Sequence, residues 1–383
     1  MPERKKSAMA GGRAVFGGAI VCSLALVAGG CQSLDKYAVN RNRKPRPATV
    51  SPSSDGRPPA VVAGDEPARA ASDGRRTAGA GADAPAPGRA APGQQYVERA
   101  QRLQTQGNLE EALREFEKAI EVNPTLTVAY LGAGDIHRQM GDYAGAERRY
   151  ARAAELEPTN FSAQYLHALS LQLLDRTGEA IRAYLRALTI RPEDFDANMN
   201  LGIAYLQVGE PAEGLAYLQR AVRTNPRNAA ARTNLGAIYS ALDRHEEAVV
   251  EYQQAAELTE LTGPVLLNLA NSLGRSGRYE EMVNTLEQLT RTEPTPNAYE
   301  RLGAGLFRLR RYEEALASYR KALEIDPNHF PALNGVGVCL MNEWHFTDQK
   351  DERARREALD AWRRSLQIQR NQPRILELLG KYQ

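Results

Sequence analysis

The side chains that most often carry catalysis or hold metal ions are scattered through this sequence of 383 residues. A helical zinc site needs two histidines four residues apart or a cluster of cysteines, and the sequence has neither pattern. We therefore predict no metal site and no cofactor. The histidines are His137, His167, His245, His329 and His345.

Glycines and carboxylates also lack the setting that catalysis would need. Gly132 and Gly134 lie inside a predicted helix, whereas a phosphate-binding loop joins a strand to a helix. Glu110, Glu246 and Glu313 begin predicted helices, where a negative charge favours the positive end of the helix dipole. That role explains them better than acid–base catalysis, so we expect a protein that is not an enzyme.

The balance of charge bears on the class of partner. The formal net charge is only +2, and lysines and arginines are not concentrated in one part of the folded region. Proteins that bind nucleic acid usually gather basic residues on one face. The sequence therefore predicts no nucleic-acid partner.

Residues 1–30 have the composition of an export signal. Basic residues precede an apolar stretch from Ala14, which is short for a membrane span of roughly 20 apolar residues. The small residues before Cys31 resemble the lipobox of bacterial lipoproteins, which implies removal of residues 1–30 and lipid attachment at Cys31. The resemblance further implies an exported, lipid-anchored protein of the cell envelope, on the periplasmic side of the outer membrane in a double-membrane bacterium. Ala28 stands where that family most often has leucine, so ordinary secretory cleavage remains an alternative.

The remaining cysteines predict no disulfide. Cys22 lies within the export signal and Cys31 would be consumed by the lipid, which leaves Cys339 without a partner. Cys339 lies on an apolar face of a predicted helix. We interpret it as a small buried hydrophobic residue rather than a reactive thiol.

Residues 31–92 are dense in alanine, proline, glycine and arginine and have few large apolar side chains. Such a composition cannot bury enough surface to offset the entropy lost on ordering. The sequence therefore predicts a disordered tether. Its basic run at 41–46 would lie close to anionic lipid headgroups, although a solvated linker is the simpler interpretation.

From residue 93 onward the sequence repeats itself. In each unit a small residue, a large apolar residue and a second small residue follow at spacings of four and three, as in Ala146, Tyr150 and Ala153. These spacings place the trio on one face of a helix. Prolines also recur every 34 residues, at Pro124, Pro158, Pro192 and Pro226.

This pattern resembles the tetratricopeptide repeat (TPR) family, whose first-helix signature is matched by Leu201, Gly202 and Tyr205. The resemblance implies an all-α fold, a right-handed superhelix or α-solenoid of about eight helix–turn–helix repeats over residues 93–372. A capping helix is expected at 373–383. The predicted units are 93–126, 127–160, 161–194, 195–228, 229–262, 263–295, 296–329 and 330–372.

Some units depart from the pattern. Gly214 replaces the small alanine of a second helix, which lowers helix propensity by about 0.8–1 kcal/mol. Glu260 replaces a closing proline, and Met282 and Leu289 stand where alanine is expected. The larger side chains should push two helices apart, so we predict a change in superhelix curvature near residues 255–290.

The eighth unit contains an insertion from about Trp344 to Arg353. We predict that it forms a loop between two helices, folded back on its own unit. The alternative is that Trp344 and Phe346 provide an extra contact point for a partner.

Asparagines recur at the sixth position of three successive units, as Asn200, Asn234 and Asn268. In the repeat family this position faces an inner groove lined by the first helices, so these residues are expected to stack as a ladder. An amide both donates and accepts hydrogen bonds, which suits an extended peptide backbone. A hydrogen bond to a neighbouring helix or to water is the alternative.

An apolar stripe is predicted beside this ladder. It consists of Tyr165, Leu169, Met199, Ile203 and Leu206, at positions that the family leaves free for ligands. Apolar side chains that are not needed for packing often mark contact sites, and methionine adapts to varied partners. These residues could instead fill the interior of a narrow superhelix.

The sequence thus predicts a non-catalytic, membrane-anchored adaptor that binds a peptide segment or a partner protein in its concave groove. The alternative is a structural protein of the envelope that assembles with copies of itself and has no dedicated peptide ligand. The oligomeric state is left open by the sequence.

Overall fold

The computed structural model describes residues 91–347 and 351–382. The predicted export signal, the lipid site Cys31 and nearly all of the predicted tether lie outside the described residues. No helix in the described part combines the length and the apolar character that a bilayer span requires.

The described residues form seventeen α-helices and no strands, which confirms the predicted all-α solenoid. The helices are α2 (Gln94–Thr105), α3 (Leu109–Val122), α4 (Thr127–Gln139), α5 (Tyr143–Leu156), α6 (Phe161–Leu173), α7 (Thr177–Ile190), α8 (Phe195–Gln207), α9 (Pro211–Thr224), α10 (Ala229–Ala241), α11 (His245–Ala256), α12 (Gly263–Arg275), α13 (Tyr279–Thr292), α14 (Pro296–Arg308), α15 (Tyr312–Ile325), α16 (Phe330–Phe346), α17 (Glu352–Ile368) and α18 (Pro373–Tyr382).

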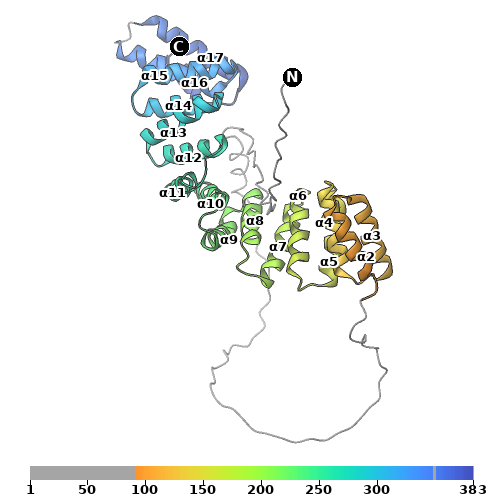
Figure 1. Ribbon diagram of the computed structural model, residues 1–383. Helices are drawn as coiled ribbons and strands as arrows, with labels where there is room; N and C mark the ends of the chain where they lie inside the picture. Colours follow the sequence, from red (N-terminus) through yellow and green to blue (C-terminus); the bar gives the residue numbers. More distant parts are fainter. Residues whose placement is uncertain (1–90, 348–350, 383) are drawn as a thin grey trace, which may run out of the picture.

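The helices stack in sequence order and curve into an arc (Figure 1). Each even-numbered helix from α2 to α16 is the first helix of a unit and packs against the odd-numbered helix that follows. First helices of most neighbouring units also contact each other, whereas the second helices make no comparable contact in the described part of the chain. Because elements on the inner side of a curve lie closer together, the first helices form the inner face.

The repeated trio of residues forms the contacts inside each unit. Ala146, Tyr150 and Ala153 of α5 are fully buried. The small residues let the paired helices approach, and the aromatic ring fills the space between them. A Cβ added to Gly134 of α4 would lie 2.6 Å from the Tyr150 ring, so glycine is needed where the ring crosses the partner helix.

The structure gives a reason for Gly214, which the sequence alone marks as a weak point of α9. A Cβ added to Gly214 would lie 2.8 Å from the carbonyl oxygen of Gly202 and 2.9 Å from Cδ1 of Ile238. Real Cβ atoms essentially never approach so closely. Gly214 therefore allows α8 and α9 to touch through their backbones.

Replacing Gly214 with alanine should destabilise the protein, although alanine is the better helix former. The gain of about 0.8–1 kcal/mol in helix propensity is opposed by overpacking, which costs about 1–3 kcal/mol. Urea unfolding of G214A and of the natural chain measures the change in the free energy of unfolding. Gly178, where an added Cβ would meet no atom within 4 Å, offers a matched control, since G178A should leave stability unchanged or raise it. Stabilisation by G214A equal to that by G178A would contradict the packing role.

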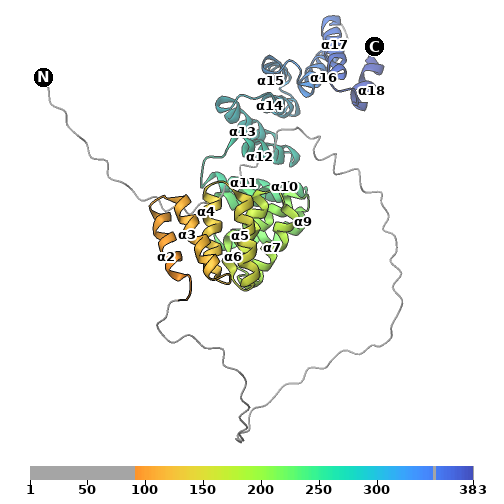
Figure 2. The same ribbon diagram turned by 90° about the vertical axis from the view of Figure 1, so that its right-hand side faces the viewer.

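The array changes direction between α11 and α12 (Figure 2). This change falls within residues 255–290, where the sequence predicts altered curvature. The two large residues are accommodated differently from the prediction, however. Met282 and Leu289 are both buried. A Cβ added to Gly274 would lie only 2.8 Å from the sulfur of Met282. The missing side chain at Gly274 makes room for the methionine.

The insertion in the eighth unit is mostly helical, so the predicted loop at 344–353 is wrong. Helix α16 continues through Phe346 and α17 begins at Glu352, and each has 17 residues where other units have 12 to 14. Trp344 packs inward, with its ring 5.7 Å from the guanidinium of Arg355, whereas Phe346 is 70% exposed. The apolar face of α18 covers the end of the array through Ile375 and Leu379, which are buried.

A partly buried histidine links α5, α6 and α7. The Nε2 atom of His167 lies 3.4 Å from a carboxylate oxygen of Glu147, which also pairs with Arg176 at 3.2 Å. Its Nδ1 atom is buried without a hydrogen-bond partner in the described part of the chain. Burial lowers the pKa of His167, and the nearby cations Arg176 and Arg186 act in the same direction, while Glu147 opposes them.

We expect the stability of the array to fall as the pH drops below about 6.5, the usual histidine value. Since the pKa of His167 is lower in the folded chain, the unfolded chain binds the proton first as the pH falls. The stabilisation is therefore complete above the unfolded pKa and is lost as the pH falls toward the folded one. Melting temperatures between pH 7.5 and 5.5 should decline less steeply in H167Q than in the natural chain. Equal slopes would rule out this contribution.

Candidate functional site

The inner face of the array is the first candidate site, and the three asparagines of the predicted ladder lie on first helices, in environments that differ. Asn200 of α8 is half-buried, and its side-chain nitrogen donates a hydrogen bond to the hydroxyl oxygen of Tyr165 on α6, at 3.1 Å. This bond joins neighbouring units. Asn200 and Tyr165 thus satisfy each other, which matches the alternative of a bond to a neighbouring helix.

Further polar contacts join neighbouring first helices. Gln172 of α6 donates a hydrogen bond to Gln207 of α8 at 3.1 Å, and it accepts one at 2.9 Å from the hydroxyl of Tyr184 on α7, within its own unit. The hydroxyl oxygens of Ser240 on α10 and Ser272 on α12 lie 2.8 Å apart. Several polar side chains on this side of the array therefore hold the units in register.

Two residues of the predicted apolar stripe belong to the core instead. Met199 is 3% exposed and Ile203 is 5% exposed, and both belong to the same buried cluster as Leu218 and Leu235. The assignment of Met199 and Ile203 to a binding surface is therefore wrong. The fifth unit packs against the fourth mainly through α10 and α9, and these two positions, predicted to be free, lie in the buried cluster that the two units share.

The other members of the stripe lie in intermediate environments. Leu169 and Leu206 are half-buried, as is Tyr165, whose ring stacks on Phe161 at 5.7 Å between centroids. Burial raises the pKa of Tyr165, and the nearby carboxylates Asp196 and Asp194 raise it further. The phenol therefore stays protonated, and its oxygen accepts the hydrogen bond from Asn200.

Asn234 of α10 and Asn268 of α12 differ from Asn200. Both are half-buried, and neither side chain makes a hydrogen bond with the residues that the structure describes. Neither is among the side chains with fully buried unpaired atoms, so both amides are open to solvent. Two adjacent units therefore present equivalent amides that remain available to a ligand.

The side chains around these amides are small on α10 and polar on α12. Thr233 and Ala237 stand at the positions that Met199 and Ile203 hold one unit earlier, and both are only half-buried. On α12, Asn271 is exposed and follows Asn268 by three residues, and therefore shares its face of the helix. We call Thr233, Asn234, Ala237, Asn268 and Asn271 the amide patch.

A cationic side chain borders the amide patch. Arg275 follows Asn268 by seven residues, which returns to the same face of α12 after two turns. It is exposed and makes no ion pair with the described residues. The amide patch thus combines hydrogen-bonding amides with a positive charge at one end.

Comparison with known proteins identifies the repeat. Sequence models described as tetratricopeptide repeat match residues 103–169, 199–261 and 296–329, and one described as TPR repeat matches residues 174–209. The chain is a tetratricopeptide repeat protein. No curated protein matches this TPR chain in sequence.

Solved structures resemble this TPR protein in fold. PilF of Pseudomonas aeruginosa is 20% identical, with 53% of this chain and 92% of that chain covered and a TM-score of 0.45. A tetratricopeptide repeat protein of Parabacteroides merdae is 18% identical, covering 65% and 98% with a TM-score of 0.45. YrrB, described as a TPR protein with an unusual peptide-binding site, is 20% identical, covering 52% and 98% with a TM-score of 0.43.

Membership in the TPR family supports a protein-interaction role for this chain. In its described residues, no group of three or more histidine, cysteine or acidic side chains is placed to hold a metal ion. Cys339 is buried, and burial raises the pKa of its thiol to about 12, so it is not a ready nucleophile.

Proposed function

We propose that this TPR protein is a non-catalytic adaptor that holds an extended segment of a partner protein against the amide patch. The observation that carries the proposal is the pair formed by Asn234 and Asn268, two equivalent amides without partners in the described chain. Asn200, at the same position one unit earlier, already has a hydrogen-bond partner. The proposed site is therefore shorter than the predicted ladder of three.

The spacing of the two amides suits an extended peptide. Neighbouring packed helices lie about 8–10 Å apart, and an extended chain rises about 3.3 Å per residue. Asn234 and Asn268 could therefore bind the backbone of residues about three apart in the partner segment. Because each amide offers both a donor and an acceptor, it can satisfy a backbone N–H and a backbone C=O together.

The unpaired charge of Arg275 favours a partner segment that carries a carboxylate at one end of the patch. Its guanidinium can form two parallel hydrogen bonds with a carboxylate. Small side chains at Thr233 and Ala237 leave room for the partner beside the amides. We propose that hydrogen bonding and charge, more than apolar burial, select the partner at this site.

The proposed place of action is the cell envelope, with the chain anchored by a lipid on Cys31. This part of the proposal rests on the sequence around Cys31, which resembles a lipobox. Two or more acyl chains give a stable membrane anchor, whereas one gives a marginal one. Incorporation of labelled palmitate that disappears in C31S would support the anchor, and unlabelled natural protein would refute it.

Photo-cross-linking can test the amide patch even though the partner is unidentified. A photoreactive amino acid at Asn271 should form a cross-link to a partner protein in intact cells, and the same group at Val250 of α11 should not. In the N234A/N268A background we expect the yield at position 271 to fall about tenfold, since each lost hydrogen bond is worth about 0.5–1.5 kcal/mol.

Variant N200A provides the matched control, because it removes an equivalent amide that is already occupied by Tyr165. Its cross-link yield should stay close to that of the natural residue, and circular dichroism should show all variants folded. Equal cross-link yields at position 271 in N200A and N234A/N268A would contradict the proposal. A cross-link to a second copy of this chain would instead favour the structural, self-assembling alternative.

A further inference from the structure

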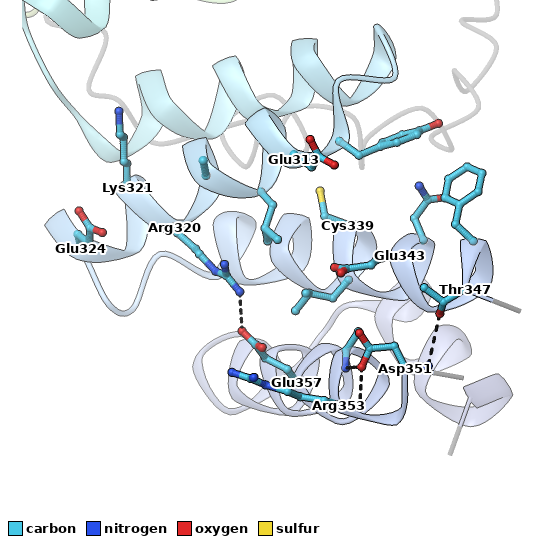
Figure 3. Close-up of a pocket in the computed structure, with 17 residues that line it drawn as sticks. Glu313, Arg320, Lys321, Glu324, Cys339, Glu343, Thr347, Asp351, Arg353 and Glu357 are labelled. Atoms are coloured by element: carbon cyan, nitrogen blue, oxygen red, sulfur yellow. Dashed lines mark hydrogen bonds and ion pairs between the residues drawn. The ribbon is translucent and has the colours of Figure 1, made fainter. Parts of the chain in front are cut away.

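A second candidate site lies at the other end of the array, where the sequence predicts a loop or, as the alternative, an extra contact point at Trp344 and Phe346. A pocket of about 890 Å³ opens between α15, α16 and α17 (Figure 3). The additional turn of α16 forms one of its walls, through Glu343 and Phe346. We call it the α15–α17 pocket.

The floor of this pocket is apolar. Leu316 and Ala317 of α15 and Cys339 and Leu340 of α16 line it, and Cys339 is neutral because burial raises the pKa of its thiol to about 12. At the rim, Phe346 is 70% exposed, the most exposed of the large hydrophobic residues in the described chain. Because Phe346 lines the same pocket as the apolar floor, the two together offer an apolar surface on which another apolar segment can pack.

The charges around the Phe346 end of the pocket are negative. Glu313 of α15 and Glu343 of α16 lie on either side of Cys339 (Figure 3). Both carboxylates are exposed, and neither forms an ion pair with the described residues. The pocket therefore presents two unpaired negative charges flanking its apolar floor.

Three basic residues also line the pocket, and two of them, Arg320 and Lys321, already have partners. Arg320 pairs with Glu357 of α17 at 2.9 Å, and the ammonium of Lys321 lies over the ring of Tyr299 at 5.6 Å from its centroid. Arg353 extends alongside Glu357 on α17 (Figure 3). A ligand that enters at the Phe346 end thus meets carboxylates first.

We propose that the α15–α17 pocket binds residues 37–46 of the same chain. This segment reads Tyr-Ala-Val-Asn-Arg-Asn-Arg-Lys-Pro-Arg and lies outside the described residues. Its apolar start matches the apolar floor and Phe346, and its basic run matches Glu313 and Glu343. No other stretch of residues 31–90 places as many basic residues so close together.

The connecting chain is long enough for this contact within one molecule. Residues 47–90, which number 44, separate the basic run from the first described residue. Fully extended they would span about 150 Å. The seven units between α2 and α16 advance the array by about 10 Å each, or about 70 Å in all. Linkage also raises the effective concentration to about the millimolar range, so even weak docking would be populated.

Trypsin cleavage of the full chain provides the test. Trypsin cuts after Arg41 and Arg43, within the proposed docking segment, and after Arg69 and Arg75, which serve as reference sites in the same molecule. Docking should make the first pair of sites slower than the reference pair. In E313Q/E343Q we expect cleavage after Arg41 and Arg43 to speed up about fivefold, because two charge contacts are lost.

Three controls make the result decisive. E98Q/E121Q removes two exposed, unpaired carboxylates from the opposite end of the array and should leave all rates unchanged. F346A tests the apolar contact at a residue that is 70% exposed and should also accelerate cleavage, with circular dichroism showing that the variant is folded. Salt at 0.5 M should abolish the protection, since a Debye length of roughly 4–5 Å screens exposed charges.

Equal cleavage rates after Arg41 and Arg69 in the natural chain, unaltered in E313Q/E343Q and in F346A, would overturn the proposal. Protection that increases with protein concentration would also overturn it, because the occupant would then be a second copy. Neither outcome depends on the partner at the amide patch, so the two proposals can fail separately.

Discussion

Replacing Trp362 with alanine should cost about 3–5 kcal/mol of stability in the eighth unit, the largest effect that we expect from a single substitution. Trp362 of α17 is 1% exposed, and its indole N–H donates a hydrogen bond to the carbonyl oxygen of Asn334 at 3.3 Å. Its ring occupies the space that a side chain at Gly337 would need. Truncation would leave a large cavity between α16 and α17.

Urea unfolding followed by the fluorescence of Trp344, the other tryptophan, can measure this loss where it occurs. Variant W362F keeps most of the volume and should lose much less stability. Since each unit contacts only its neighbours, units far from α17 should unfold as before in W362A. A loss below about 1 kcal/mol would show that the ring does not hold the last unit together.

Replacing Ile203 with alanine should cost about 2–5 kcal/mol and leave the partner site intact in the folded protein. Ile203 is 5% exposed and packs with residues of α9 and α10, so its truncation opens a cavity between the fourth and fifth units. Replacing Leu206, which is half-buried on the same helix, with alanine should lower the free energy of unfolding by less. Chemical denaturation of I203A and L206A compares the two.

The same pair of variants distinguishes a core residue from a ligand contact. If Ile203 bound the partner, I203A would retain its stability and lose cross-linking at position 271. That result would restore the sequence-based assignment and contradict the burial seen in the structure. The expected result is the reverse, with lower stability and an unchanged cross-link yield below the melting temperature.

The repeat architecture can be predicted from the sequence because its signals are local. Spacings of three and four residues fix which side of a helix is apolar, and prolines at intervals of 34 residues fix the period. The two helices of each unit pack together through residues that are close in sequence. Side chains such as Tyr150 are fully buried where the pattern places them.

The candidate site can be predicted only in part, because it depends on how neighbouring units approach. The repeat pattern assigns equal roles to Asn200, Asn234 and Asn268, but only Asn200 lies where a tyrosine of the preceding unit, Tyr165, can accept its hydrogen bond. Burial of Met199 likewise depends on how closely α10 approaches α8. Side chains of neighbouring units, such as Tyr165 and Asn200, decide both outcomes, and a pattern within one unit does not contain that information.

The α15–α17 pocket escapes prediction for a different reason. The insertion breaks the 34-residue period, and such a break is typical of a loop. The additional residues instead lengthen α16, and Phe346 follows Cys339 by seven residues, which returns to the same face of the helix after two turns. Helical periodicity across the insertion is the signal in the sequence that indicates this wall of the pocket.

The hydrogen bonds between neighbouring first helices have a mechanical consequence. The bond between Tyr165 and Asn200 and the bond between Ser240 and Ser272 each join the first helices of two neighbouring units. Because a unit contacts only its neighbours, the angle between one pair of units does not constrain the angle between another pair. A change of a few degrees in the angle between each pair of neighbouring units would therefore add up to a large change in the length of the array. Weakening one such bond should make the whole molecule more compliant under tension without melting any helix.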